Sequence, residues 1–210
     1  MESVKKAIEI EQQFIQSASR EDLLQYVQKH AVHSSNFVLF CEKADMPTIK
    51  YHLRKYSLTA ENIIYVLENG SIDYLEPLFA ERDLSADALN YLFEKGSTEA
   101  ICEYVRYHDL PEKFEKKLFS PGLEKAAMFY VSHYILFASS EVVMMKFGGL
   151  RMLRRYIEHE DLHSEAELLL LTPAFFEVVS EYLAKWSFSE VAKKRYAEIL
   201  SSMAENGEEQ

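Results

Sequence analysis

The histidines at His159 and His163, with carboxylates between them, are the first feature whose spacing could support chemistry. Two imidazoles four residues apart bind a metal ion when they share one face of a helix. Here we expect a turn instead, with His159 at the end of one helix and His163 at the start of the next. His30 and His33 occupy the equivalent turn earlier in the chain. The sequence therefore predicts a structural turn, with no metal and no cofactor.

Nucleophilic chemistry has equally little support. The two cysteines, Cys41 and Cys102, lie in apolar helical runs without the electropositive surroundings that lower the pKa of a thiol. No G-x-S-x-G, phosphate-binding loop or dinucleotide fingerprint is present in the sequence. We therefore expect a protein that is not an enzyme and two buried free thiols.

The cell compartment follows from the same composition. Charged residues interrupt the first fifteen positions, so they form no signal-peptide core, and no apolar run is long enough to span a bilayer. The chain is expected to be cytoplasmic, without membrane contact.

Basic side chains gather unevenly in a chain of net charge −11. Two interpretations stay open: a solvated face with local ion pairs, or a groove in which arginines donate paired hydrogen bonds to the carboxylates of an acidic peptide. The candidate partner-binding cations are Lys50, Arg54, Arg106, Arg151, Arg154 and Arg155.

Aromatic residues give two further candidates. Tyr104, Tyr130 and Tyr156 recur at one position, together with Tyr26 and Tyr182. They are interpreted either as packing between helices or as an aromatic ladder along a binding groove.

Phe129 occupies a position that is mostly polar elsewhere in the chain. Either the helices deviate locally or an exposed apolar patch marks a partner site.

The elements that carry these residues follow from an internal recurrence. Segment 58–71 (LTAENIIYVLENGS) is matched 26 residues later by segment 84–97 (LSADALNYLFEKGS). The same spacing aligns three apolar columns along the chain, which we predict to be core. The first column is Phe14, Phe40, Val66, Leu92, Leu118, Met144, Leu170 and Tyr196; the second is Leu23, Ile49, Leu75, Ile101, Ala127, Leu153 and Val179; the third is Val27, Leu53, Phe79, Val105, Val131, Ile157 and Leu183.

Each period reads as helix, tight turn, helix. Thr59 and Ser85 are expected to cap the first helices of their periods. Gly70 and Gly96 are expected to end those helices with a positive φ. Helices of about ten residues are marginal alone, so each pair must pack against its neighbours. We predict an all-α fold, a right-handed α-solenoid of about seven 26-residue helix-turn-helix repeats and a final helix over residues 1–203, followed by a disordered acidic tail at 204–210.

Segments 70–79 (GSIDYLEPLF) and 96–105 (GSTEAICEYV) resemble the second helix of an ankyrin repeat. The spacing of 26 rather than 33 residues and the absence of a Thr-Pro-Leu-His opening depart from that family, so the resemblance extends to α-solenoids in general. It implies a scaffold that binds protein partners through one face.

The predicted function is thus a non-catalytic scaffold or adaptor, of the kind that includes inhibitors and immunity proteins, binding another protein or an acidic peptide. The alternative is a helical repeat that binds nucleic acid, which the net charge of −11 disfavours because such binding relies on Lys and Arg. The sequence does not indicate an oligomeric state.

Overall fold

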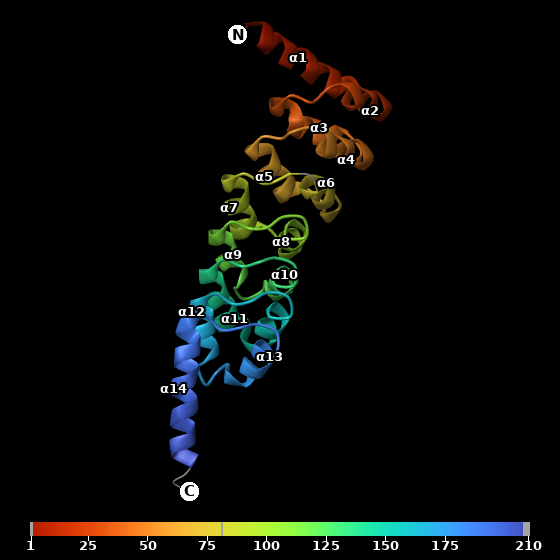
Figure 1. The fold of residues 1–210 in the computed structure, drawn as a ribbon. Coiled ribbons are helices and arrows are strands. Elements are labelled where there is room, and N and C mark those ends of the chain that lie inside the picture. Colours follow the sequence, from red (N-terminus) through yellow and green to blue (C-terminus); the bar gives the residue numbers. More distant parts are fainter. Residues whose placement is uncertain (1, 81, 208–210) are drawn as a thin grey trace. The chain divides into compact units, whose positions relative to one another are not determined.

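In the computed structural model, residues 2–80 and 82–207 are described, and this part of the chain is helical without strands (Figure 1). The all-α prediction is confirmed. The α-helices are α1 (Glu2–Ser17), α2 (Arg20–Lys29), α3 (Phe37–Lys43), α4 (Met46–Lys55), α5 (Ala60–Asn69), α6 (Leu75–Phe79), α7 (Ala86–Lys95), α8 (Thr98–Tyr104), α9 (Glu112–Leu118), α10 (Glu124–Tyr130), α11 (Ala138–Tyr156), α12 (Ser164–Leu170), α13 (Val179–Leu183) and α14 (Glu190–Gly207). Short 3-10 turns precede α3, α6 and α13 at Ser34–Asn36, Ile72–Tyr74 and Phe176–Val178.

Side-chain caps begin several of these helices where the sequence predicts them. Thr59 accepts a hydrogen bond from the backbone N–H of Asn62, and Ser85 accepts one from Ala88. Each bond pairs one of the four N–H groups that the first turn of a helix leaves without an internal partner. Ser19 forms a complete capping box at the start of α2.

The helix ends at Gly70 and Gly96 correct one expectation. Their φ angles are −77° and −68°, in the extended region rather than the left-handed one. Ala44 ends α3 with φ −76°, so the φ angle of this turn does not by itself require glycine. Positive φ occurs instead at Gly122 (89°) and at Gly149 (55°), where α11 is kinked into two helical halves.

The contacts of the chain divide into two compact units, Met1–His108 (unit 1) and Asp109–Gln210 (unit 2). In unit 1, α1, α3, α5 and α7 contact one another in succession, and so do α2, α4, α6 and α8. Figure 1 shows α5 and α7 on one side of this unit and α6 and α8 on the other. In unit 2, α11 contacts α9, α10 and α12, and α12 contacts α14.

The predicted core columns are buried with three exceptions. All members of the second column are buried, and so are the third column up to Ile157 and the first column from Phe40 to Leu170. Leu183 is 38% exposed, and Phe14 and Tyr196 are half-buried. These three lie in the first or last periods, where fewer neighbouring helices cover them.

Side chains of several types donate hydrogen bonds to backbone carbonyls at the ends of neighbouring helices. At four places a side chain reaches the carbonyl 29 residues earlier, near the end of a preceding helix: Tyr56 to Val27 (2.8 Å), Arg82 to Leu53, His108 to Phe79 (2.6 Å) and Trp186 to Ile157 (2.9 Å). The last carbonyls of a helix have no partner inside it, so these bonds supply donors to the ends of α2, α4, α6 and α11.

The predicted single domain over residues 1–203 stays a prediction. α14 continues to Gly207, into the segment predicted as a tail, and residues 208–210 lie outside the described part. Among the described residues, no helix combines the length and the apolar character needed to cross a bilayer.

Candidate functional site

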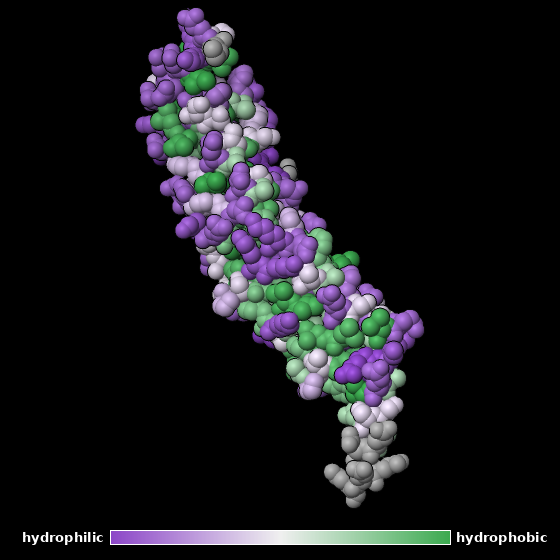
Figure 2. All heavy atoms as spheres, turned by 90° about the vertical axis from the view of Figure 1, so that its left-hand side faces the viewer, coloured by the Kyte–Doolittle hydropathy of each residue, from purple (hydrophilic) through white to green (hydrophobic). Residues whose placement is uncertain are grey.

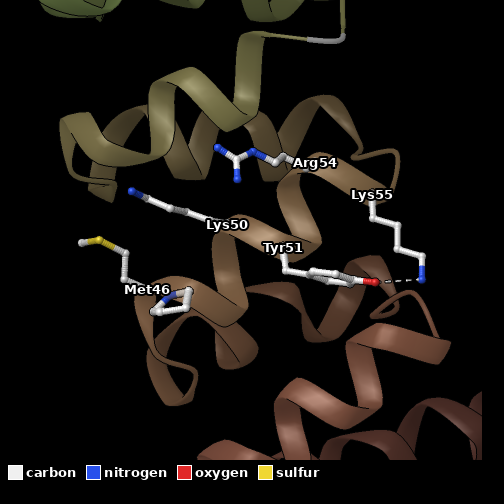
Figure 3. A pocket seen from close by; sticks show the side chains of 6 residues that line it. Met46, Lys50, Tyr51, Arg54 and Lys55 are labelled. Atoms are coloured by element: carbon white, nitrogen blue, oxygen red, sulfur yellow. Dashed lines mark hydrogen bonds between the residues drawn. The ribbon is translucent and has the colours of Figure 1, made fainter.

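The exposed side of α4 carries the first group of candidate cations. Asp45 caps this helix by accepting from Thr48, and Pro47 lies in its first turn, where a missing N–H costs little. Ile49 and Leu53 face the core, so the opposite side of the helix reaches the surface. There a depression of about 640 Å³ is lined by Met46, Pro47, Lys50, Tyr51, Arg54 and Lys55, which we call the α4 face (Figure 3).

The cations of the α4 face differ in how they are held. Arg54 forms an ion pair of 2.6 Å with Glu76, and both side chains are largely exposed. Lys55 donates to the carbonyl of Gln28 (2.5 Å) and to the hydroxyl of Tyr51 (3.2 Å). The hydrogen bond to Tyr51 raises the pKa of Lys55. No ion pair of Lys50 is found among the described residues. An incoming carboxylate therefore meets Lys50 directly and can compete with Glu76 for Arg54.

The three arginines of α11 do not act as one group. Arg154 bonds to Glu177 (2.9 Å) and Glu181 (3.1 Å) of neighbouring elements. Arg155 pairs with Glu158 (2.5 Å) and also reaches Ser132. Exposed pairs of this kind contribute little stability but occupy the guanidinium donors.

Arg151 differs from these two arginines. Its side chain lines a second depression, of about 560 Å³, with Glu124, Lys125, Met128, Phe147, Gly148 and Met152, which we call the α10–α11 groove.

Two further candidates lie apart from these depressions. Arg106, in the turn after α8, pairs with Glu103 of that helix (2.8 Å). Phe129 is half-buried, and its ring stacks on His133 at 4.1 Å between centroids. Phe129 is therefore neither a buried core residue nor a freely exposed one.

The candidate tyrosines lie in the interior. Tyr104, Tyr130 and Tyr156 are 1%, 0% and 0% exposed. Each hydroxyl accepts the backbone N–H of a leucine 20 residues earlier: Leu84 (3.4 Å), Leu110 (2.7 Å) and Leu136 (3.1 Å). Of the two interpretations, packing between helices is the one that fits, because no surface of these rings is left for a ligand. They are not carried further as binding residues.

Sequence reasoning missed a set of buried carboxylates in unit 2. Glu115, Glu141 and Glu167 are at most 2% exposed. Each accepts the backbone N–H of the residue 22 positions later: Phe137 (3.0 Å), His163 (2.8 Å) and Ser189 (3.0 Å). Their spacing of 26 residues was the available signal, but a glutamate in a helix normally reads as a solvated position.

Phenol and carboxylate in this set are paired. Tyr156 donates to Glu141 (3.1 Å) and Tyr182 donates to Glu167 (3.1 Å). Burial raises the pKa of Glu141 and also that of Tyr156. A carboxyl with a raised pKa in a cleft is a typical sign of catalysis. The same pair with the same 15-residue spacing also occurs in unit 1, where Tyr26 donates to Glu11 (2.7 Å), and this recurrence indicates a structural role.

The histidines His159 and His163 and the two cysteines are the remaining candidates for chemistry. His163 lies at the start of α12, and its ring nitrogen contacts Glu141 at 2.9 Å, while His159 lies beyond the end of α11. No cluster of three or more potential metal ligands occurs in the described residues. Cys41 and Cys102 are in no disulfide and are half-buried rather than fully buried, and burial raises the pKa of Cys41 to about 12. Its thiol is therefore not activated.

Comparison of the chain with models of protein families, with curated proteins and with solved structures finds no match.

Proposed function

We propose that this chain is a non-catalytic helical-repeat scaffold that binds an acidic segment of another protein, with the α4 face as a binding surface. In this proposal the architecture is a right-handed α-solenoid of about seven repeats with a final helix, and the scaffold works in the cytoplasm. Cys41 and Cys102 are in no disulfide, which is in keeping with a reducing compartment.

Recurring contacts support the repeat architecture. Tyr182, like the three tyrosines described above, accepts the N–H of the leucine 20 residues earlier, Leu162 (3.2 Å). At the corresponding place in unit 1, His52 accepts the N–H of Val32 (3.1 Å). Bonds that return at one sequence separation are expected when each helix pair meets the next in the same way.

The observation that carries the binding proposal is the composition of the α4 face. A chain of net charge −11 repels acidic segments at long range. A local group of cations around an apolar depression can offset this repulsion and bind such a segment. Lys50 supplies a charge without an ion pair, Arg54 supplies a planar fork suited to carboxylates, and Met46 supplies apolar contact. Figure 3 shows these side chains projecting from the same helix.

The test is direct binding of a fluorescently labelled, glutamate-rich peptide, measured by anisotropy. We expect Lys50→Glu to weaken binding at least about tenfold, since it replaces an attractive charge by a repulsive one. The matched control is Lys95→Glu, the same change at an exposed position on α7 of the same unit. Equal affinity in the two variants, or no binding by the unmodified protein, would contradict the proposal.

The same assay addresses nucleic-acid binding. A labelled single-stranded oligonucleotide is expected not to compete with the peptide. Competition that disappears steeply with added salt would favour the alternative function.

A further inference from the structure

The α10–α11 groove differs in chemistry from the α4 face. Half-buried Met128 and Phe147 and the buried Met152 give it an apolar lining. Methionine side chains are flexible and polarisable, so a surface built on them adapts to apolar groups of different shape. Hydrophobic side chains reach the surface on the face drawn in Figure 2. In unit 2, Ile135 is 67% exposed and Phe137 is 49% exposed.

Two adjacent glycines shape the groove. Gly149 has φ 55° and ψ −150°, which no helical residue adopts, and it redirects the chain inside α11. A Cβ on Gly148 would lie 2.2 Å from the sulfur of Met152, so only glycine lets that side chain pack against the backbone there. The kink and the missing side chain together allow Met152 to form the wall of the groove.

Two exposed cations lie on the rim of the groove. Lys125 and Arg151 are exposed, and no ion pair of either is found in the described part of the chain. Glu124, which also lines the groove, accepts the backbone N–H of Gly122 (3.1 Å). This contrasts with Arg154 on the same helix, whose donors bond to two glutamates. The rim therefore attracts carboxylates next to an apolar floor.

We infer that the α10–α11 groove is a second binding site, which takes one large apolar side chain of a partner protein segment with acidic residues beside it. The apolar side chain lies against Met128, Phe147 and Met152, and the flanking carboxylates bond to Lys125 and Arg151. This inference rests on the proposed scaffold function but concerns a different surface, in unit 2. It adds an apolar anchor, which gives specificity that charge alone does not supply.

The methionines make the two sites separately observable. With 13C-methyl-labelled methionine, NMR follows Met46 on the α4 face and Met128 and Met152 in the groove in one spectrum. Two probes are titrated: a short acetylated peptide with one central leucine flanked by glutamates, and the same peptide with alanine in place of leucine. We expect the leucine peptide to shift the signals of Met128 and Met152, and the alanine peptide to bind there at least about tenfold more weakly.

Variants separate the contributions of the rim from general charge. Arg151→Glu is expected to weaken the shifts of Met128 and Met152 at least about tenfold and to leave the response of Met46 unchanged. Lys194→Glu, an exposed position on α14, is the matched control and is expected to have no effect on either site. Circular dichroism of each variant confirms that the helices persist.

Each outcome decides between the two proposals. Shifts confined to Met46 would overturn the groove and leave the α4 face in place. Shifts confined to Met128 and Met152 would support the groove and contradict the α4 face. Equal binding of the leucine and alanine peptides at the groove would also overturn the inference, because the apolar anchor would then contribute nothing.

Discussion

One pair of positions in unit 1 and its equivalents in unit 2 carry opposite chemistry, although unit 1 also has a carboxylate and phenol pair, Glu11 and Tyr26 (2.7 Å). In unit 2, glutamate and tyrosine form the buried pairs Glu141–Tyr156 and Glu167–Tyr182. The positions 78 residues before Glu141 and Tyr156, three times the 26-residue spacing, are Ile63 and Leu78 of unit 1. Both of these residues are apolar and buried. One arrangement of helices thus tolerates either an apolar interior or a paired carboxylate and phenol.

The comparison shows what a buried carboxylate requires. Glu141 accepts from the hydroxyl of Tyr156 and from the backbone N–H of His163, and the ring Nδ1 of His163 lies 2.9 Å from its Oε1. Ile63 has no such donors around it, because Leu78 carries no hydroxyl. A buried glutamate at the position of Ile63 would therefore be tolerated only together with hydrogen-bond donors for its carboxylate.

The largest effect is expected from transplanting the carboxylate alone. Ile63→Glu should destabilise unit 1 by about 4–5 kcal/mol, because it buries a charge without partners and removes apolar packing. Adding Leu78→Tyr should recover about 1–2 kcal/mol by supplying a donor. Urea unfolding followed by circular dichroism measures both. A double variant less stable than the single one would show that the two interiors are not interchangeable.

A smaller loss is expected from removing the acceptor in unit 2. Glu141→Ala should cost about 3 kcal/mol, since it leaves the hydroxyl of Tyr156 and the N–H of His163 without their acceptor in the interior. Glu141→Gln keeps one carbonyl oxygen and should cost about 1 kcal/mol. The fluorescence of Trp186, the single tryptophan, reports unfolding of unit 2. If both variants lose the same stability, hydrogen bonding to the carboxyl oxygens is not what holds this site.

The smallest expected effect is a difference between the two units in how their stability depends on pH. Burial lowers the pKa of His52 to about 4, and its ring nitrogen accepts from Val32 only when it is unprotonated. The unfolded chain therefore binds the proton more readily, and unit 1 loses roughly 2 kcal/mol as the pH falls from 6.5 towards 4. His52→Leu, which copies Leu78, should remove this dependence.

Unit 2 should respond to pH in the opposite direction. Burial raises the pKa of Glu115 and Glu141, so the folded state binds their protons more readily than the unfolded chain. Their contribution is fully present below the ordinary glutamate value of 4.5 and is lost as the pH rises through the raised values. Hydrogen exchange at pH 5 and pH 7, compared between peptides of the two units, measures both trends. Parallel changes in both units would contradict the assignment.

The sequence predicted the helices and most of the core, because apolar periodicity and cap residues are local signals. The caps at Thr59 and Ser85 and the column from Leu23 to Val179 are present as predicted. The positive φ predicted for Gly70 and Gly96 was wrong, since an extended helix end, which Ala44 also adopts, gives the same small-residue pattern.

The candidate site was predicted less well. Lys50 and Arg54 lie together on one helix, as helical spacing requires. By contrast, the ion pairs of Arg154 with Glu177 and Glu181 depend on residues outside α11. The spacing of residues on one helix does not reveal such pairs. The buried glutamates were missed for the same reason, because their donors lie 15 and 22 residues away.

The bonds between a helix end and the following pair have a consequence for how the chain is made. Tyr56, His108 and Trp186 each reach back 29 residues, and the tyrosine hydroxyls meet backbone groups 20 residues away. Closing such short loops costs little chain entropy, and topologies of this kind fold fast. Each of these bonds can form once the later of its two residues has left the ribosome, so within each unit the order of synthesis is also a workable order of folding.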